Sequence, residues 1–246
     1  MRTILIAIAL AAASGPALAG GHPHFVEPQL FIARGGGASP QVALTLDACS
    51  GRTDRRILDA LVENRIAATI FVTASWLRRN GPSVAVMQAH PELFELENHG
   101  FAHVPAIDDQ KRMFGLKTAG SVPAIRAEIQ GGVDAMATIK TPKPLWYRDA
   151  TARYSLDAIG LIHTMGYRVA GYSLNADMGA SLLAGQVEKR ISAARDGDVI
   201  IAHINQPTRA SGAGVVNGIL ALKRKGFRFL RLEDVAESEK PVRPNV

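Results

Sequence analysis

Two histidines, His99 and His103, stand four residues apart in a run that could do chemistry. On a helical turn this spacing places both imidazoles on one face, where they can bind one divalent metal ion. Such a pair is a weak signal by itself, because solvated or buried histidine pairs without a ligand are common. Its position directly after an apolar run, behind Glu97-Asn98, favours the metal-binding interpretation.

An aspartate and an arginine could form a second part of the same reactive centre. Asp47 follows the apolar run 42–46, and Arg148 follows the run 145–147. A buried Asp47 needs a cationic partner, and Arg148 could hold its carboxylate ionised and ready to accept a proton from water. A purely structural ion pair is the alternative.

A third histidine completes the ionisable set. His203 lies near the end of the apolar run 199–204 and could donate a proton to a leaving group. Asp177, which follows the run 168–174, could raise the basicity of His203 by holding its ring. The chain therefore offers a base, an acid and two metal-binding rings at separate places in the sequence.

The elements that must position these residues alternate between short apolar runs and helical periodicity. Helical patterns stand between most of the strand candidates and indicate an α/β fold with a parallel sheet or barrel. Carboxyl ends of parallel strands form one rim, so the polar residues should converge there. One domain with a barrel fits the length better than two domains, and an open doubly wound sheet is the alternative. The seven predicted strands cover 42–46, 67–72, 93–96, 145–147, 168–174, 199–204 and 227–232.

The first residues have the pattern of a secretory signal peptide. An apolar run over 4–13 follows Arg2, and small residues lead to Ala19, after which we expect cleavage. The run is too short to cross a bilayer of about 30 Å, so we expect an exported protein, periplasmic or secreted, without a stable membrane anchor. The expected divisions are a signal peptide over 1–19, a mobile arm over 20–40, a catalytic domain over 41–236 and a C-terminal tail over 237–246.

The charge and the cysteine count exclude some functions. The net charge of +6 is spread along the chain and no basic run alternates with aromatic residues, so nucleic acid is not an expected partner. Cys49 is the only cysteine, so no intramolecular disulfide can form. Burial is the commonest state of a free cysteine, and a metal ligand or a nucleophile are the alternatives for Cys49.

The chain resembles the polysaccharide deacetylase family, also called carbohydrate esterase family 4. The resemblance covers about 42–232 and keeps the order of the family's motifs. The corresponding segments are Thr45-Leu46-Asp47-Ala48, His99 to His103, Arg148-Asp149-Ala150-Thr151, Asn175-Ala176-Asp177-Met178 and Ile201-Ala202-His203.

The resemblance implies a distorted (β/α) barrel of about seven parallel strands and a hydrolase that acts on carbon–nitrogen bonds other than peptide bonds, or on ester bonds, in acetylated glycans. It implies a divalent metal ion, usually zinc, which polarises the acetyl carbonyl while its water attacks. The roles that it implies are metal binding by His99 and His103, general base for Asp47, orientation of Asp47 by Arg148, general acid for His203, and tuning of His203 by Asp177.

The chain departs from the family pattern at the third metal ligand. The family has a second aspartate where this chain has Ala48, and a methyl group cannot coordinate a metal. Asp47, Cys49 or additional waters could replace the missing carboxylate, and a thiolate would favour zinc over harder ions. Met178 stands where the family has tryptophan, and Asp149-Ala150-Thr151 replaces a Pro-aromatic segment, so the wall of the acetyl pocket is altered.

Three functions are consistent with these residues. The first is an exported metal-dependent deacetylase acting on an acetylated glycan or cell-envelope substrate. The second is a catalytically inactive relative that binds glycan or another envelope component, an interpretation based on Ala48. The third is a hydrolase with Cys49 as nucleophile and His203 as its base, which leaves the other two histidines without a role.

Overall fold

The computed structural model describes residues 25–35 and 39–235. The expected signal peptide and C-terminal tail lie outside the described residues. Within the described part of the chain, no helix is both long and apolar enough to cross a membrane.

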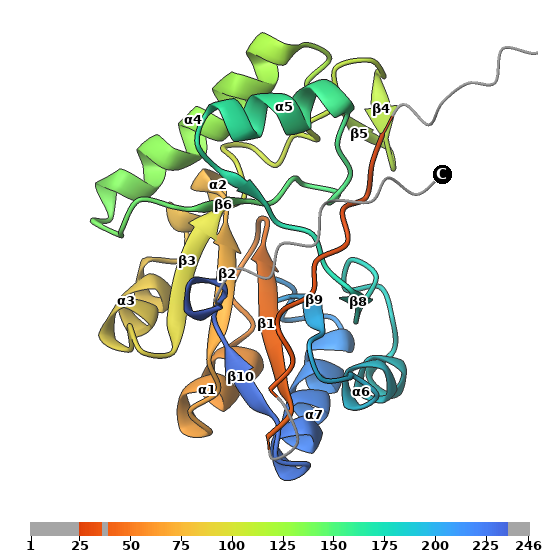
Figure 1. Ribbon diagram of the computed structural model, residues 1–246. Helices are drawn as coiled ribbons and strands as arrows, with labels where there is room; N and C mark the ends of the chain where they lie inside the picture. The colour runs from red at the N-terminus through yellow and green to blue at the C-terminus, as the bar shows by residue number, and fades with distance from the viewer. Residues whose placement is uncertain (1–24, 36–38, 236–246) are drawn as a thin grey trace, which may run out of the picture.

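A curled sheet of parallel strands forms the centre of the molecule (Figure 1). Seven strands follow one another in the order β7-β6-β3-β2-β1-β9-β8, and β10 pairs in parallel with the first residues of β1. This confirms the predicted parallel barrel-like architecture of about seven strands. The strands are β1 (Gln41–Ala48), β2 (Ala68–Val72), β3 (Phe94–Asn98), β6 (Trp146–Tyr147), β7 (Arg168–Val169), β8 (Leu174–Asn175), β9 (Val199–His203) and β10 (Arg228–Leu230).

Within residues 25–35 and 39–235, seven α-helices accompany the sheet, and several begin at polar caps. Asp54, Thr73, Ser121 and Ser155 each accept a backbone N–H bond from the first turn of a helix, which satisfies a donor that has no partner inside the helix. The helices are α1 (Arg55–Glu63), α2 (Ala74–Leu77), α3 (Gly81–Ala89), α4 (Val122–Thr138), α5 (Leu156–Thr164), α6 (Ala184–Ser192) and α7 (Ser211–Arg224). A two-stranded hairpin of β4 (Arg112–Met113) and β5 (Leu116–Lys117) and a short 3₁₀ helix (Leu232–Asp234) complete the described elements.

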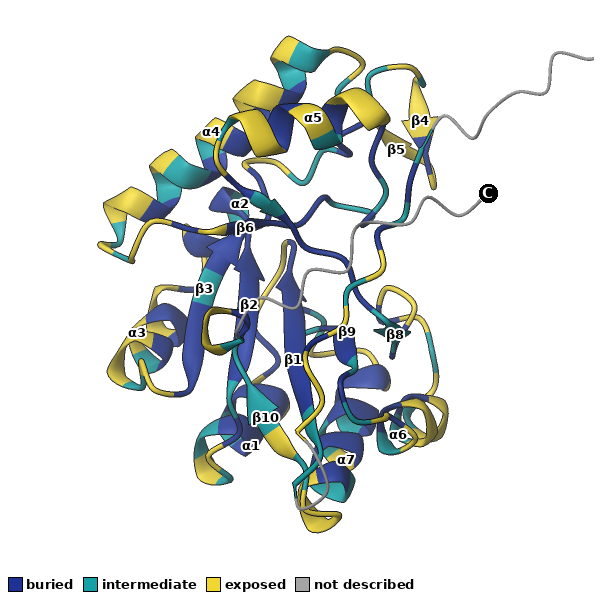
Figure 2. Cartoon of the chain, viewed as in Figure 1, coloured by how far each residue is buried: buried dark blue, intermediate teal, exposed yellow. Residues whose placement is uncertain are grey.

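The two faces of the sheet have different compositions. Leu44 and Leu46 of β1 point to the outer face, where they pack in the main core with residues of α1, α6 and α7. Figure 2 shows β1 as buried along most of its length. Because side chains alternate along a strand, Thr45 and Asp47 point to the inner face. The inner face therefore carries buried polar groups, while the outer face holds the sheet against its helices.

One expectation from the sequence is wrong. The run 168–174 is not one strand but the two short strands β7 and β8. Residues 25–35, which fall in the range predicted as an N-terminal arm, pack beside this segment. Leu30 and Tyr172 are joined by a backbone hydrogen bond, and the Tyr172 N–H donates to the Pro28 carbonyl. The N-terminal segment thus takes the hydrogen bonds that would have continued the strand, and it buries Val26 and Ile32 against the fold.

Candidate active site

The carboxyl ends of the strands bring the six predicted site residues together. Asp47 and His203 are partners in the register of β1 and β9. His99 follows β3 and Arg148 follows β6, while Asp177 follows β8 and contacts His203. Convergence at this rim is the arrangement expected for parallel strands.

Arg148 is completely buried and holds Asp47 on the inner face of the sheet. Its Nη1 donates to Asp47 Oδ1 at 2.9 Å and to Thr45 Oγ1 at 2.8 Å, and its Nη2 donates to the Gly171 carbonyl. The guanidinium also stacks on the Phe71 ring, 4.1 Å from its centroid. Burial acts to raise the pKa of Asp47, but Arg148, together with two nearby histidines, lowers it below its usual value. Asp47 is therefore ionised and can accept a proton.

Asp177 fixes the second half of the site. One of its oxygens lies 3.0 Å from His203 Nδ1, and the other accepts the His203 backbone N–H at 2.8 Å. Burial acts to lower the pKa of His203, but the Asp177 carboxylate outweighs it and raises that pKa well above its usual value. His203 therefore carries a proton near neutral pH.

His99 and His103 face each other, but not on a helical turn as the sequence predicted. Their ring centroids are 5.0 Å apart with the planes at 70°, and the residues between them form a loop. Gly100 has φ +89° and His103 has φ +62°, so the loop makes two left-handed turns that a helix cannot contain. The loop fits here because Glu128 Oε1 accepts the backbone N–H groups of Ala102 and Val104, on either side of His103.

The ring nitrogens of the two imidazoles have different surroundings. His99 Nδ1 donates to the Arg148 carbonyl at 2.8 Å, and its Nε2 lies 3.5 Å from the Cys49 sulfur. The Nε2 atom of His103 is buried and has no hydrogen-bond partner among the described residues. Buried polar atoms rarely lack a partner, so this nitrogen points to a missing ligand.

Cys49 completes a cluster of metal-binding atoms with these rings. Its Sγ lies 3.5 Å from His99 Nε2, and the donor atoms of Cys49, His99 and His103 all lie within 4.8 Å of one another. Burial acts to raise the pKa of the Cys49 thiol, but the surrounding histidines hold it well below its usual value. Burial acts to lower the pKa of His99, whereas Asp47 and Cys49 raise it to about 9. The cluster therefore has the charge balance of a thiolate beside an imidazolium.

One residue of the site was missed from the sequence. Glu128 lies in the buried stripe of α4 with Ile125, Ile129 and Gly132, where a helix normally presents apolar groups. A glutamate within an otherwise apolar helical stripe could have identified this residue from the sequence, because a buried carboxylate needs hydrogen-bond donors from another segment. Its donors are the backbone N–H groups of the histidine loop.

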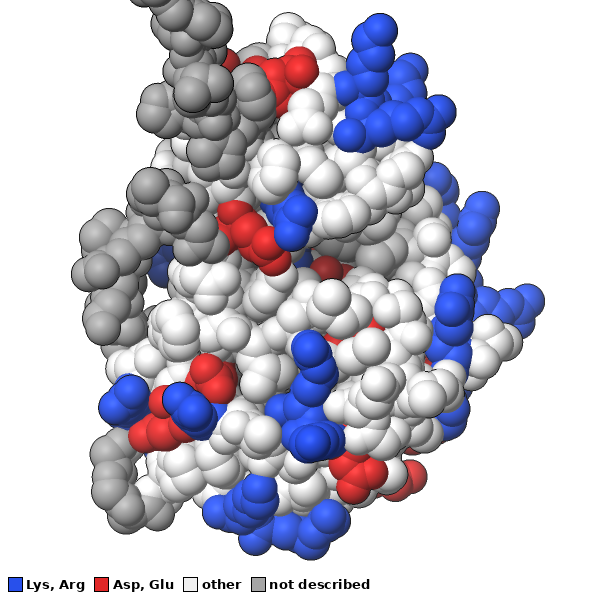
Figure 3. Space-filling view, turned by 90° about the vertical axis from the view of Figure 1, so that its right-hand side faces the viewer, with Lys and Arg blue, Asp and Glu red and all other residues white. Residues whose placement is uncertain are grey.

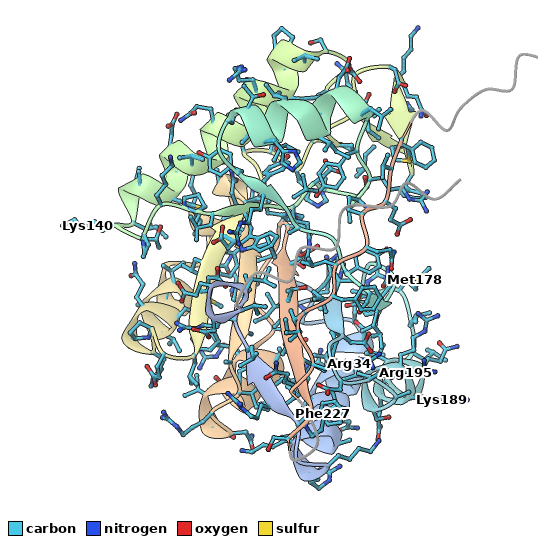
Figure 4. The ribbon with its side chains drawn as sticks, viewed as in Figure 1. Arg34, Lys140, Met178, Lys189, Arg195 and Phe227 are labelled. Carbon is cyan, nitrogen blue, oxygen red and sulfur yellow. The ribbon has the colours of Figure 1, made fainter. Side chains whose placement is uncertain are left out.

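The rim of the site offers exposed apolar groups. Phe101 lies between the two histidines in sequence and is 45% exposed, and Met178 beside Asp177 is 52% exposed. Figure 4 shows Met178 at the surface near β8, on the opposite side of the molecule from Lys140. In Figure 3 a recess crosses the face that this view presents, with acidic atoms at its bottom and Lys and Arg in separate groups around it.

Comparison with known proteins agrees with this geometry. The family model for polysaccharide deacetylases matches residues 34–170, which is more than half of the chain and includes Asp47, His99, His103 and Arg148. A bifunctional xylanase/deacetylase from Pseudobutyrivibrio xylanivorans is 26% identical over 208 residues, covering 83% of this chain and 32% of that protein. The chain thus spans about a third of the length of that relative.

Solved structures share the fold. The Xyl-CE4 domain of a multidomain xylanase from the hindgut metagenome of Trinervitermes trinervoides superposes with a TM-score of 0.64 at 23% identity, covering 85% of this chain and 94% of that one. A CE4 family pseudoenzyme from Bacillus anthracis gives a TM-score of 0.64 at 16% identity, covering 85% of this chain and 69% of that one. With its motifs gathered at one rim and the family model matched over most of the barrel, this chain belongs to the polysaccharide deacetylase family.

Proposed function

We propose that this protein is a metal-dependent deacetylase, exported to the periplasm or the medium, that hydrolyses the acetyl amide or ester of an acetylated glycan. The observation that carries the proposal is the placement of an ionised Asp47 and a protonated His203 as register partners on adjacent strands. A base and an acid close to each other are what acyl transfer to water requires.

The residues present fit a divalent metal ion. The His103 nitrogen without a partner among the described residues and the His99 Nε2 beside the Cys49 sulfur lie in one cluster, so three nitrogen and sulfur donors can meet one ion. When bound, such an ion polarises the acetyl carbonyl and lowers the pKa of a coordinated water. His99 and His103 would hold it.

The chain's own residues move the protons of the reaction. Asp47 accepts a proton from the attacking water, and Arg148 keeps the Asp47 carboxylate ionised and oriented. His203 donates its proton to the nitrogen or oxygen of the sugar as the bond to the acetyl carbon breaks. Asp177 stabilises the His203 imidazolium before this transfer and fixes its ring. The products are acetate and the free amine or hydroxyl of the glycan.

Ala48 is the specific observation that favours a second function. Its side chain is completely buried in the apolar core and cannot coordinate a metal. A chain that had lost its metal would still expose Phe101 and Met178 beside the site residues, which suits a catalytically inactive binder of glycan or another envelope component.

Elemental analysis of the purified protein, followed by acetate release from acetylated glucosamine and xylose oligomers with and without chelator, tests the proposal. We expect one equivalent of metal and release that chelator abolishes. Absence of both metal and release, with retained glycan binding, would support the inactive binder. Release that resists chelator but is abolished by a thiol alkylator would instead support Cys49 as nucleophile.

A further inference from the structure

The direction of side chains at the end of β1 decides which residue can replace the missing carboxylate. Ala48 packs in the outer core with Leu46, so position 48 points away from the histidines. Side chains alternate along a strand, and Cys49 therefore follows Asp47 to the inner face. The hydroxyl groups of Thr73 and Ser75 both donate to the Cys49 carbonyl, which fixes the residue at the strand end.

Asp47 is already engaged and lies outside the cluster. Its Oδ1 accepts from Arg148 at 2.9 Å, and its Oδ2 is 3.9 Å from His99 Nε2. The Cys49 sulfur is closer to the same nitrogen, at 3.5 Å, and it is within 4.8 Å of the His103 donor as well. The Cys49 thiol is therefore near both imidazoles, whereas Asp47 has one oxygen on the Arg148 guanidinium and the other near His99 alone.

We infer that Cys49 is the third protein ligand of the metal, so that the site is one thiolate and two imidazoles rather than one carboxylate and two imidazoles. This inference rests on the proposed function and adds the ligand and the class of metal. A metal ion needs the thiolate of Cys49 and unprotonated Nε2 atoms on both imidazoles, so the proton held by the cluster is released to solvent when the metal binds. Three protein ligands leave a position for water, as in catalytic zinc sites.

A thiolate changes which ions the site selects. Soft sulfur donors favour Zn²⁺ and Co²⁺, whereas Mg²⁺, Ca²⁺ and Mn²⁺ prefer oxygen. The thiolate also makes metal loading sensitive to thiol modification, because an alkylated sulfur cannot act as the thiolate ligand. The chain has only one cysteine, so any thiolate signal or thiol modification reports on Cys49 alone.

Cobalt binding to the chelator-stripped full chain tests the inference. We expect one equivalent of Co²⁺ with a sulfur-to-cobalt charge-transfer band in the near ultraviolet, and Zn²⁺ should protect Cys49 from iodoacetamide, as read by mass spectrometry. Cys49→Ser should remove the band and weaken Zn²⁺ binding by at least about 100-fold, more than the loss from an outer-shell change. Cys49→Asp should bind metal without the band and shift its preference toward Mn²⁺.

Two controls separate this inference from the proposed function. His103→Ala should lose zinc protection while retaining Cys49. If wild-type protein binds Co²⁺ without the band and Cys49→Ser binds zinc with the same affinity, the ligand assignment is wrong, and chelator-sensitive acetate release would still support the proposed function. If the band appears but no acetate is released from any acetylated sugar, the ligand assignment stands and the proposed function fails.

Discussion

Two buried carboxyl groups on the inner face of the sheet differ in protonation: one is ionised near neutral pH and the other keeps its proton. Asp47 on β1 and Glu97 on β3 are both register partners of Phe71, one on each side of β2. Asp47 has Arg148 as its neighbour, and its pKa is lowered. Glu97 has Glu95 as its neighbour, and burial together with that second carboxyl raises the pKa of Glu97 to about 9.

The difference shows that burial alone does not make a catalytic base. Glu97 accepts the N–H groups of Leu145 and Trp146, and Glu95 accepts the Thr69 hydroxyl, yet these bonds do not offset the burial of two carboxyls side by side. The glutamate pair therefore keeps a proton near neutral pH, while the aspartate does not. The two glutamates line a pocket of about 480 Å³ whose lining contains none of the predicted site residues.

Removal of the Arg148 guanidinium should remove the cause of the low pKa of Asp47 and so its difference from Glu97. Arg148→Met leaves the Asp47 carboxylate buried without a counter-ion, and breaking a buried pair in this way costs about 3–5 kcal/mol of unfolding free energy. Chemical denaturation measures the loss. Arg55→Met removes an exposed pair with Asp59 and should cost about 0.5 kcal/mol or less. A loss below about 1 kcal/mol for Arg148→Met would contradict the structural importance of the pair.

Neutralisation of Asp47 should show how much acetate release depends on the charge of this side chain rather than on its size. Asp47→Asn keeps the size of the side chain but removes the base, so acetate release should fall by roughly 10²- to 10⁴-fold. Metal content should stay at one equivalent, because Asp47 is not a ligand in this assignment. Asp59→Asn at an exposed position serves as the control. Loss of metal in Asp47→Asn would show that the aspartate coordinates it.

A third buried carboxyl, Glu128, sharpens the comparison because its partners are backbone N–H groups. Glu128→Ala frees the loop that carries His103, and we expect zinc affinity to fall by about 10- to 100-fold, the usual effect of losing a group that orients a ligand. Glu128→Gln retains a carbonyl oxygen for Ala102 and Val104 and should restore most of the affinity. Equal affinities in all three proteins would show that the loop needs no such support.

The glutamate pair should make stability depend on pH. The folded chain keeps a proton that the unfolded chain loses near pH 4.5, so stability declines as the pH rises from about 5 to 9, by at most about 1.4 kcal/mol per pH unit for one proton. In Glu95→Gln an amide can donate to Glu97 without a titrating proton. Urea denaturation between pH 6 and 9 should therefore give a flatter profile for this variant.

The wild-type profile also contains His99 and His203, whose raised pKa values act in the same direction. The comparison with Glu95→Gln is therefore the decisive one, because both proteins retain these histidines. Parallel profiles would show that the glutamates do not share a proton.

Much of the fold was predictable because its signals are local. The apolar runs at β1, β2, β3 and β9 predicted strands within a few residues of their observed bounds. The prediction of one strand over 168–174 was wrong because residues 28–30, which are distant in sequence, form hydrogen bonds with this segment. The helical turn considered for His99 to His103 was wrong because Glu128, another distant residue, supports a loop there.

By itself, the sequence determined the order of strands and helices, the family, and the identity of the groups that can bind a metal or move a proton. Only the tertiary structure decided that Cys49 faces the two imidazoles while Asp47 faces Arg148. It also decided that one buried carboxyl is ionised and that another keeps its proton. The physical reason is that strand and helix patterns depend on neighbours along the chain, whereas a ligand set and a charge state depend on which side chains from distant segments share a buried space.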